Sequence, residues 1–154
     1  MTRYFRLPIR VYIEDTDASG IVFHANYLKF MERARAEMIR ACGYEMRSSL
    51  QHNINFVVSR LSINYKSPAY VDDSIVSSVR ISRLGKSKVV FDQRIVRLAD
   101  GHFGWENAAV EDIKSEQIEL VEAEVVVACV SLATGKPVKM PNEMRDALLN
   151  NSSC

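Results

Sequence analysis

The chain has 154 residues, of which 47% are hydrophobic and 25% are charged, so it is long enough for one compact domain with a single core. Its 20 Lys and Arg residues are nearly balanced by 19 Asp and Glu residues. This balance excludes the strongly basic surface that drives binding to nucleic acid or to an anionic membrane. We therefore expect a single domain over residues 1–149 and a frayed tail over residues 150–154.

Neither a signal peptide nor a membrane span is visible in the sequence. The first ten residues have no apolar core of signal-peptide length, and nowhere do about 18 apolar residues follow one another. Three cysteines, Cys42, Cys129 and Cys154, are widely separated and form no Cys-x-x-Cys pair, which favours reduced thiols over disulfides or a zinc site. We therefore expect a cytoplasmic protein with Cys42 and Cys129 in its core.

The chain opens with a predicted strand and a polar loop. Ile9, Val11 and Ile13 alternate with polar residues or tyrosine, the period of a strand with one buried face. Residues 15–20 then bring Asp, Thr, Ser and Gly together, which is typical of a structured loop.

A long amphipathic helix follows this loop. From Tyr27 to Cys42 the apolar residues recur at spacings of three and four, which predicts a helix from about Ala25 to Cys42. Gly43 is suited to end it. We expect Arg35 on the polar side of this helix, in structural ion pairs.

Most of the remaining chain has the pattern of strands. Alternation predicts a strand over residues 57–65 with Val57, Ser59 and Leu61 on one face. Residues 99–117 fit neither period and are predicted to form a surface excursion. The other predicted elements are a hairpin over residues 75–98, a buried strand over residues 119–132 and a short helix after Pro141.

The order of these elements is typical of an α+β fold. One long helix comes early in the chain, and about four strands with short links follow it. The sequence therefore predicts an antiparallel sheet with the helix packed against one face.

Two carboxylates, Asp15 and Asp17, lie between the first strand and the helix, near a helix N-terminus whose unpaired N–H groups attract negative charge. Aspartates at such positions more often cap the helix than catalyse, so capping is the alternative to catalysis. For His24, just before the first helical turn, the alternative is a structural hydrogen bond. The three histidines lack metal-ligand spacing, and the nucleophile-elbow, P-loop and dinucleotide motifs are absent.

The segment from Tyr12 to Met38 resembles the active-site segment of the hotdog-fold acyl-CoA thioesterases. It carries an Asp-x-Asp motif ending at Asp17, an aromatic-His pair ending at His24, an Asn-Tyr pair, and Glu-Arg-Ala-Arg within the helix. The Tol-Pal-associated branch, which is similar to the 4-hydroxybenzoyl-CoA thioesterases, shows the strongest resemblance. A weaker match continues to residues 122–125. The resemblance implies a hotdog fold, in which a sheet of about five strands wraps around the central helix.

The resemblance also implies a reaction, the hydrolysis of acyl-CoA thioesters without a metal, with coenzyme A as part of the substrate and not a cofactor. It assigns Asp17 as the nucleophile on the thioester carbon or as the general base for water. It assigns the backbone N–H of His24 and the helix terminus to polarise the thioester oxygen, with the His24 side chain assisting. Tyr12 and Asp15 are weaker candidates for substrate binding, and Asp15 alternatively stabilises a turn.

Arg80, Arg83, Lys86 and Lys88 surround the predicted hairpin turn with no acidic residue between them. Such a group favours the phosphates of coenzyme A, and an ordinary solvated loop is the equal alternative. The resemblance further implies a homodimer joined at its sheet edges with the active site at the interface, or a dimer of dimers. The alternative function is a binding module for acyl carrier protein or an envelope complex, with hydrolysis as a secondary activity.

Overall fold

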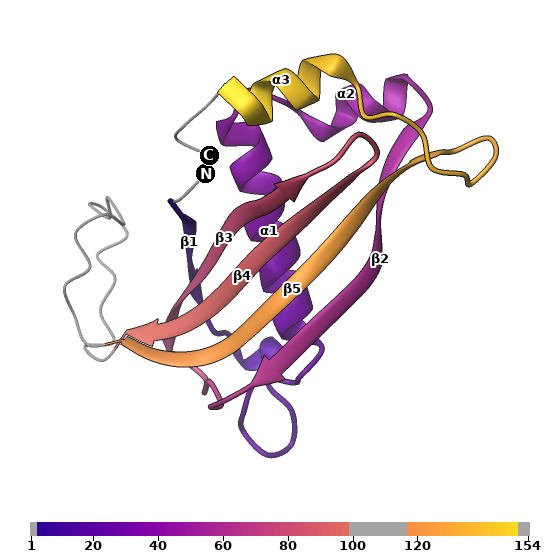
Figure 1. Ribbon diagram of the computed structural model, residues 1–154. Helices are drawn as coiled ribbons and strands as arrows, with labels where there is room; N and C mark the ends of the chain where they lie inside the picture. The colour runs from indigo at the N-terminus through magenta and orange to yellow at the C-terminus, as the bar shows by residue number, and fades with distance from the viewer. Residues whose placement is uncertain (1–2, 99–116, 151–154) are drawn as a thin grey trace.

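The computed structural model describes residues 3–98 and 117–150 as a five-stranded antiparallel sheet that wraps around one long helix (Figure 1). The strands are β1 (Phe5–Arg10), β2 (Ile54–Tyr65), β3 (Ser74–Leu84), β4 (Lys88–Leu98) and β5 (Gln117–Ser131). The helices are α1 (Asn26–Ala41), α2 (Met46–Gln51) and α3 (Asn142–Asn150), and η1 (Ile13–Asp15) is a 3₁₀ turn. The strand order is β1-β3-β4-β5-β2, which leaves β1 and β2 at the edges. The predicted α+β arrangement is confirmed.

Helix α1 packs one apolar stripe against the sheet. Its buried side chains include Tyr27, Phe30, Met31, Ala34 and Met38, whose spacings of three and four place them on one side of the helix. Side chains from every strand contribute to the same core cluster. The predicted helix is confirmed to within one residue at each end.

Buried polar side chains also hold α1 to the sheet. The Ser77 hydroxyl donates to the carbonyl of Phe30 at 3.1 Å, and the Gln93 amide donates to the carbonyl of Met31 at 3.0 Å. Arg35 in turn donates to the amide oxygen of Gln93 at 2.8 Å. Arg35 was expected in structural ion pairs, but the hydrogen bond that the structure shows is to the neutral amide of Gln93, because the curved sheet brings β4 against this side of the helix.

The first strand ends earlier than its sequence pattern indicates. β1 stops at Arg10, which pairs with Ser74, the first residue of β3, and beyond it Val11 bonds through its backbone to Asp72 and Asp73 in the loop before β3. The Asp15 carboxylate accepts the backbone N–H of Tyr12 at 2.9 Å, and the chain turns into η1. Ile13 is therefore 79% exposed and not buried on a strand face.

Strand β2 carries a bulge that its alternation did not predict. The pairing of β2 with β5 shifts register between Val58 and Arg60, so Ser59 is the extra residue. Val58 and Leu61, on either side of the bulge, both line the cavity beneath α1. The prediction that Val57, Ser59 and Leu61 share one face was wrong because the bulge inverts the alternation.

Most of the later elements agree with the sequence. The hairpin of β3 and β4, the buried strand β5 and the helix α3 are confirmed, whereas α2 was not predicted because six residues are too few to show a helical period. Helix α3 continues to Asn150, one residue into the predicted tail. Residues 151–154 and all but the last residue of the predicted excursion lie outside the described residues. Within residues 3–98 and 117–150, no helix is long and apolar enough to cross a membrane.

Two of the cysteines lie in the core, as predicted. Cys129 is completely buried and free, whereas Cys42 is buried and disulfide-bonded. The prediction of reduced thiols was therefore wrong for Cys42. Its spacing from the other cysteines gave no sign of a bond, since bonded cysteines can be far apart in sequence.

Candidate active site

The loop between β1 and α1 folds back on itself as a short antiparallel pair. Thr16 pairs with Val22, and the backbone N–H of Asp17 donates to the carbonyl of Ile21 at 2.9 Å. Gly20 makes the return possible because its φ of +78° is a left-handed conformation that suits glycine. The loop therefore holds Asp17 in a fixed turn at the same end of the molecule as the start of α1.

The two aspartates of this loop have different partners, and neither caps α1. One oxygen of the Asp17 carboxylate accepts the backbone N–H of Ser19 at 2.8 Å, while the Asp17 side chain stays exposed. The Asp15 carboxylate is engaged with Tyr12, which fits the turn-stabilising alternative for Asp15. Ala25, at the N-cap position, offers no side-chain hydrogen bond. The interpretation of these aspartates as caps of α1 was therefore wrong.

The start of α1 consequently presents unpaired N–H groups. Asn26 donates its backbone N–H to the carbonyl of Phe23 at 2.8 Å, but those of His24 and Ala25 donate to no other residue in the described parts of the chain. The Asn26 side chain ties the helix to the loop by donating to the carbonyl of Asp15 at 2.8 Å. An uncapped helix N-terminus carries a partial positive charge and accommodates a developing anion.

The end of β2 brings residues to this place that the sequence did not single out as functional. The Tyr65 hydroxyl donates to the carbonyl of His24 at 2.8 Å, and its ring lies edge-on to that of Tyr27, with 5.7 Å between centroids. The Tyr27 hydroxyl accepts the backbone N–H of Ala69 at 3.1 Å. One sign of this role was visible in the sequence, a tyrosine at the end of a predicted strand shortly before Pro68. Strand alternation alone accounted for that tyrosine, so it was not singled out.

A cavity of about 530 Å³ lies between α1 and the strands β2 and β5. Its walls are mostly apolar, with Phe56, Val58 and Leu61 on β2, and Glu32 and Arg35 are among its polar residues on α1. Cavities of this size and composition are typical of sites that bind an apolar group through a few polar contacts.

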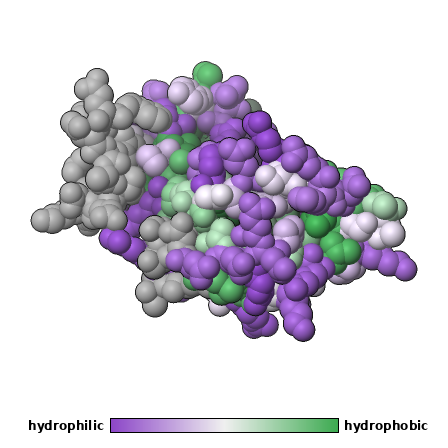
Figure 2. Space-filling model, turned by 90° about the horizontal axis from the view of Figure 1, so that it is seen from above, coloured by the Kyte–Doolittle hydropathy of each residue, from purple (hydrophilic) through white to green (hydrophobic). Residues whose placement is uncertain are grey.

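The predicted phosphate-binding residues lie elsewhere in the same chain. Arg83, Lys86 and Lys88 are exposed around the β3–β4 turn, which lies beside α3, whereas the Asp17 loop lies at the other end of the sheet (Figure 1). Figure 2 looks onto the end that carries α3 and shows hydrophilic side chains over much of it. Strand β3 separates the two ends, and its 11 residues span roughly 33 Å. The structure thus brings Tyr12, Asp15, Asp17 and His24 into one loop segment, but not the three basic residues.

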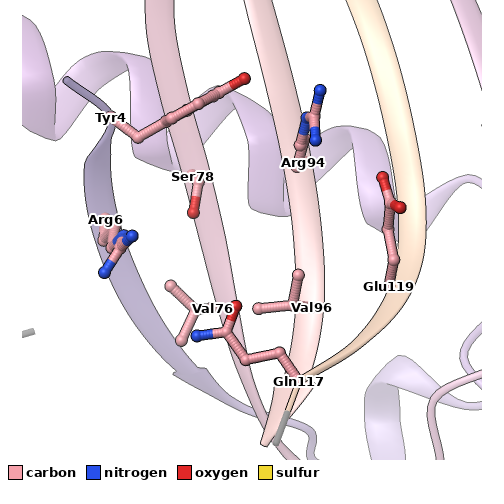
Figure 3. Close-up of a pocket in the computed structure, with 8 residues that line it drawn as sticks. All are labelled: Tyr4, Arg6, Val76, Ser78, Arg94, Val96, Gln117 and Glu119. Atoms are coloured by element: carbon pink, nitrogen blue, oxygen red, sulfur yellow. The ribbon is translucent and has the colours of Figure 1, made fainter. Parts of the chain in front are cut away.

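A second, polar cavity of about 290 Å³ lies on the face of the sheet that points away from α1 (Figure 3). Tyr4, Arg94 and Glu119 are among its lining residues. Arg80, whose positive charge belongs to the same sequence cluster as the basic turn, lies on this face and pairs with Asp92 at 2.7 Å. The sheet separates this cavity from α1, so it is not part of the candidate site.

Comparisons with known proteins identify the family of this chain. Residues 19–102 match the Thioesterase superfamily. The acyl-CoA thioester hydrolase YbgC of Escherichia coli O157:H7 is 36% identical over 143 residues, which cover 93% of this chain and 94% of that protein. The acyl-CoA thioesterase YbgC of Haemophilus influenzae is 36% identical over 144 residues, with 93% of each chain covered.

Solved structures lead to the same family. A probable thioesterase from Bartonella henselae has a TM-score of 0.68 at 34% identity and covers 90% of this chain and 98% of its own. A 4-hydroxybenzoyl-CoA thioesterase variant in complex with 4-hydroxybenzoyl-CoA has a TM-score of 0.77 at 13% identity, with 96% and 99% covered, which supports the fold alone. The resemblance found in the sequence is confirmed: the chain belongs to the thioesterase superfamily and is a hotdog-fold thioesterase.

Proposed function

We propose that this thioesterase hydrolyses acyl-CoA to a carboxylic acid and coenzyme A, with Asp17 and the N-terminus of α1 as its reacting groups. The observation that carries the proposal is the exposed Asp17 carboxylate in the loop that leads to the unpaired N–H groups of His24 and Ala25. The names of the relatives at 36% identity support acyl-CoA as the substrate class.

The start of α1 supplies electrostatic stabilisation. As the thioester carbon becomes tetrahedral, its oxygen gains negative charge, and the backbone N–H of His24 donates a hydrogen bond to it. Donors that are already in place cost no reorganisation during the reaction, and one such donor is worth about 3–4 kcal/mol. The uncapped N-terminus of α1 adds its partial positive charge.

Asp17 supplies the attack by one of two routes. In the first, a carboxylate oxygen bonds to the thioester carbon, coenzyme A leaves as thiolate, and water hydrolyses the resulting anhydride to release the acid. In the second, Asp17 takes a proton from water, and the hydroxide attacks while the proton passes to the leaving thiolate. Both routes consume one water, use no metal and need Asp17 ionised. The His24 imidazole assists by orienting water or substrate.

The cavity beneath α1 offers a place for the acyl group. Its apolar walls on β2 exclude water from an acyl chain, and burying that chain contributes about 0.8 kcal/mol per methylene. Tyr12, which is 59% exposed, is available to cover a substrate at the loop, and Asp15 holds the backbone of Tyr12 in place.

Coenzyme A binding requires a second copy of the chain in this proposal. Val57, Val58 and Leu61 are exposed on β2, an edge strand whose open side can pair with another strand. A two-fold axis between two β2 strands runs them antiparallel, so the Asp17 end of one protomer meets the β3–β4 turn of its partner. The basic residues Arg83, Lys86 and Lys88 of one protomer then bind the phosphates of the coenzyme A whose thioester lies at Asp17 of the other. A cytoplasmic location fits this substrate and stays a prediction.

Release of free thiol from short, long and aromatic acyl-CoAs tests the proposal, with the wild type and Asp17→Asn measured side by side in the presence of a chelator. Asparagine keeps the shape and the Ser19 contact but removes the negative charge. We expect turnover by the wild type and a loss of at least about a hundredfold in the variant.

Glu14→Gln is the matched control, because Glu14 is an exposed acid in the same segment to which no reacting role is assigned. It should retain wild-type turnover. Undiminished activity of Asp17→Asn would refute the role of Asp17. A wild type that cleaves none of the panel would refute acyl-CoA hydrolysis and favour the carrier-protein alternative.

A further inference from the structure

Tyr65 ends β2 and reaches across to the start of α1. Its hydroxyl donates the 2.8 Å hydrogen bond to the carbonyl of His24, and its ring contacts the buried ring of Tyr27. Backbone pairing of Tyr65 with Val121 already fixes this end of the strand. The hydroxyl is therefore not needed for the pairing of β2, and its one contact in the described structure is with the peptide at the helix start.

This hydrogen bond acts on a peptide unit of the proposed oxyanion site. The His24 carbonyl and the Ala25 N–H belong to the same peptide plane, and that N–H donates to no other described residue. A hydrogen bond to the carbonyl oxygen polarises the amide and makes its N–H a stronger donor. It also restrains rotation of the peptide, so the backbone of His24 keeps one orientation. Burial raises the pKa of Tyr65, so the hydroxyl stays protonated at neutral pH, as an ordinary tyrosine does, and can donate.

The loop after β2 holds the other side of the same helix start. Ala69 donates its N–H to the Tyr27 hydroxyl at 3.1 Å and accepts the backbone N–H of Val22 at 2.9 Å. These contacts fix the chain on both sides of His24. The Tyr65 hydroxyl restrains His24 itself, through the hydrogen bond to its carbonyl. This hydroxyl can be removed by substitution without altering any backbone hydrogen bond.

We propose that Tyr65 is a positioning residue of the thioesterase, which holds the His24–Ala25 peptide in the orientation that presents the helix N–H groups to the thioester oxygen. The inference rests on the proposed function and extends it to a residue outside the loop and the helix. Tyr65 does not touch the reacting atoms, so it affects the rate through the peptide alone.

The test compares Tyr65→Phe with the wild type on the best acyl-CoA of the panel. Phenylalanine keeps the ring contact with Tyr27 and removes only the donor. Because one hydrogen bond is lost, we expect kcat to fall about fivefold to tenfold. KM should change by less than about twofold, since the ground-state contacts with the substrate remain. Tyr70→Phe is the matched control, because Tyr70 lies five residues further on and its hydroxyl has no partner in the described parts of the chain.

A second substrate separates positioning from a general loss of structure. In a dithioester, sulfur replaces the carbonyl oxygen and accepts hydrogen bonds weakly, so misplaced N–H groups matter less. The ratio of wild-type to Tyr65→Phe rates should therefore fall towards one with the dithioester. Both substrates are measured on the same preparation, so comparing the two ratios cancels any difference in the fraction of folded protein.

The outcomes are distinguishable. Equal ratios for the two substrates, or an unchanged kcat in an otherwise active enzyme, would overturn the role of Tyr65 and leave the proposed function standing. A wild type without thioesterase activity would overturn the proposed function and this inference together.

Discussion

Arg35 and Gln93 form a polar connection through the core, with the Arg35 guanidinium donating to the Gln93 amide oxygen at 2.8 Å. Gln93 is completely buried and passes the connection on by donating to the carbonyl of Met31. Burial lowers the pKa of Arg35, which reflects the cost of placing its charge beside the sheet. The pair anchors the middle of α1 to the central strand β4, and this anchor helps to fix the position of the start of the helix.

Replacing Gln93 by leucine should destabilise the fold by about 2–3 kcal/mol, because the partly buried guanidinium of Arg35 loses its acceptor. Leucine has nearly the volume of glutamine, so a cavity is not the cause of the loss. The measurement is the free energy of unfolding from urea titration. Gln51→Leu, at an exposed position at the end of α2, is the control and should change stability by less than about 0.5 kcal/mol.

The double variant Gln93→Leu with Arg35→Met isolates the cause. Without the guanidinium, no charge is left unpaired, and the double variant should recover part of the stability that Gln93→Leu loses. If the double variant is less stable than Gln93→Leu by the full cost of a second core substitution, the two side chains act independently. The hydrogen bond between them would then contribute no coupling free energy to stability.

Much of the fold could be predicted from the sequence because its main elements have clear periods. The stripe of α1 from Tyr27 to Met38 determined the helix, and the turn at Gly85 separated β3 from β4. The errors arose where tertiary pairing overrides the local pattern. Ile13 continues an alternating series, but β3 begins at Ser74, opposite Arg10, so the sheet has no residue opposite Ile13.

The candidate site was predictable in part, for a related reason. Asp17 and His24 lie within one short segment, so a single sequence motif includes both of them. Tyr65 is 41 residues from His24 in sequence, and only the folding of β2 against α1 brings its hydroxyl to that peptide. Likewise, the positive charges at the β3–β4 turn were visible in the sequence, but their separation from Asp17 depends on the direction of the strands.

Reversing two charges at the β3–β4 turn, with Lys86→Glu and Lys88→Glu together, should raise KM for acyl-CoA about tenfold and leave kcat nearly unchanged. The reason is that these side chains meet the nucleotide phosphates and not the thioester. Thioesters of N-acetylcysteamine, which lack the nucleotide, should show no such effect. Arg33→Glu with Arg40→Glu makes the same change in net charge on an exposed part of α1 and is the control. An equal rise in KM for both substrate types would mean that the turn does not bind phosphates.

The edge of β2 gives the test of the proposed dimer. Val57 is 38% exposed on a strand whose outer side is unpaired, and it does not line the cavity beneath α1, so a second β2 strand would cover it without involving the acyl site. Val57→Asp places a charge in that contact, and burying an unpaired charge costs more than the contact gains. Sedimentation velocity over a range of micromolar concentrations should show a dimer for the wild type and a monomer for Val57→Asp.

Leu132→Asp is the matched control for the dimer, because Leu132 is 51% exposed just beyond the end of β5. It should remain a dimer. Since the basic turn and Asp17 meet only across two protomers, Val57→Asp should also lose affinity for acyl-CoA as it dissociates, while keeping its helical circular dichroism. A monomeric variant with an unchanged KM for acyl-CoA would show that one chain binds the whole substrate, and the basic turn would then have no part in the site.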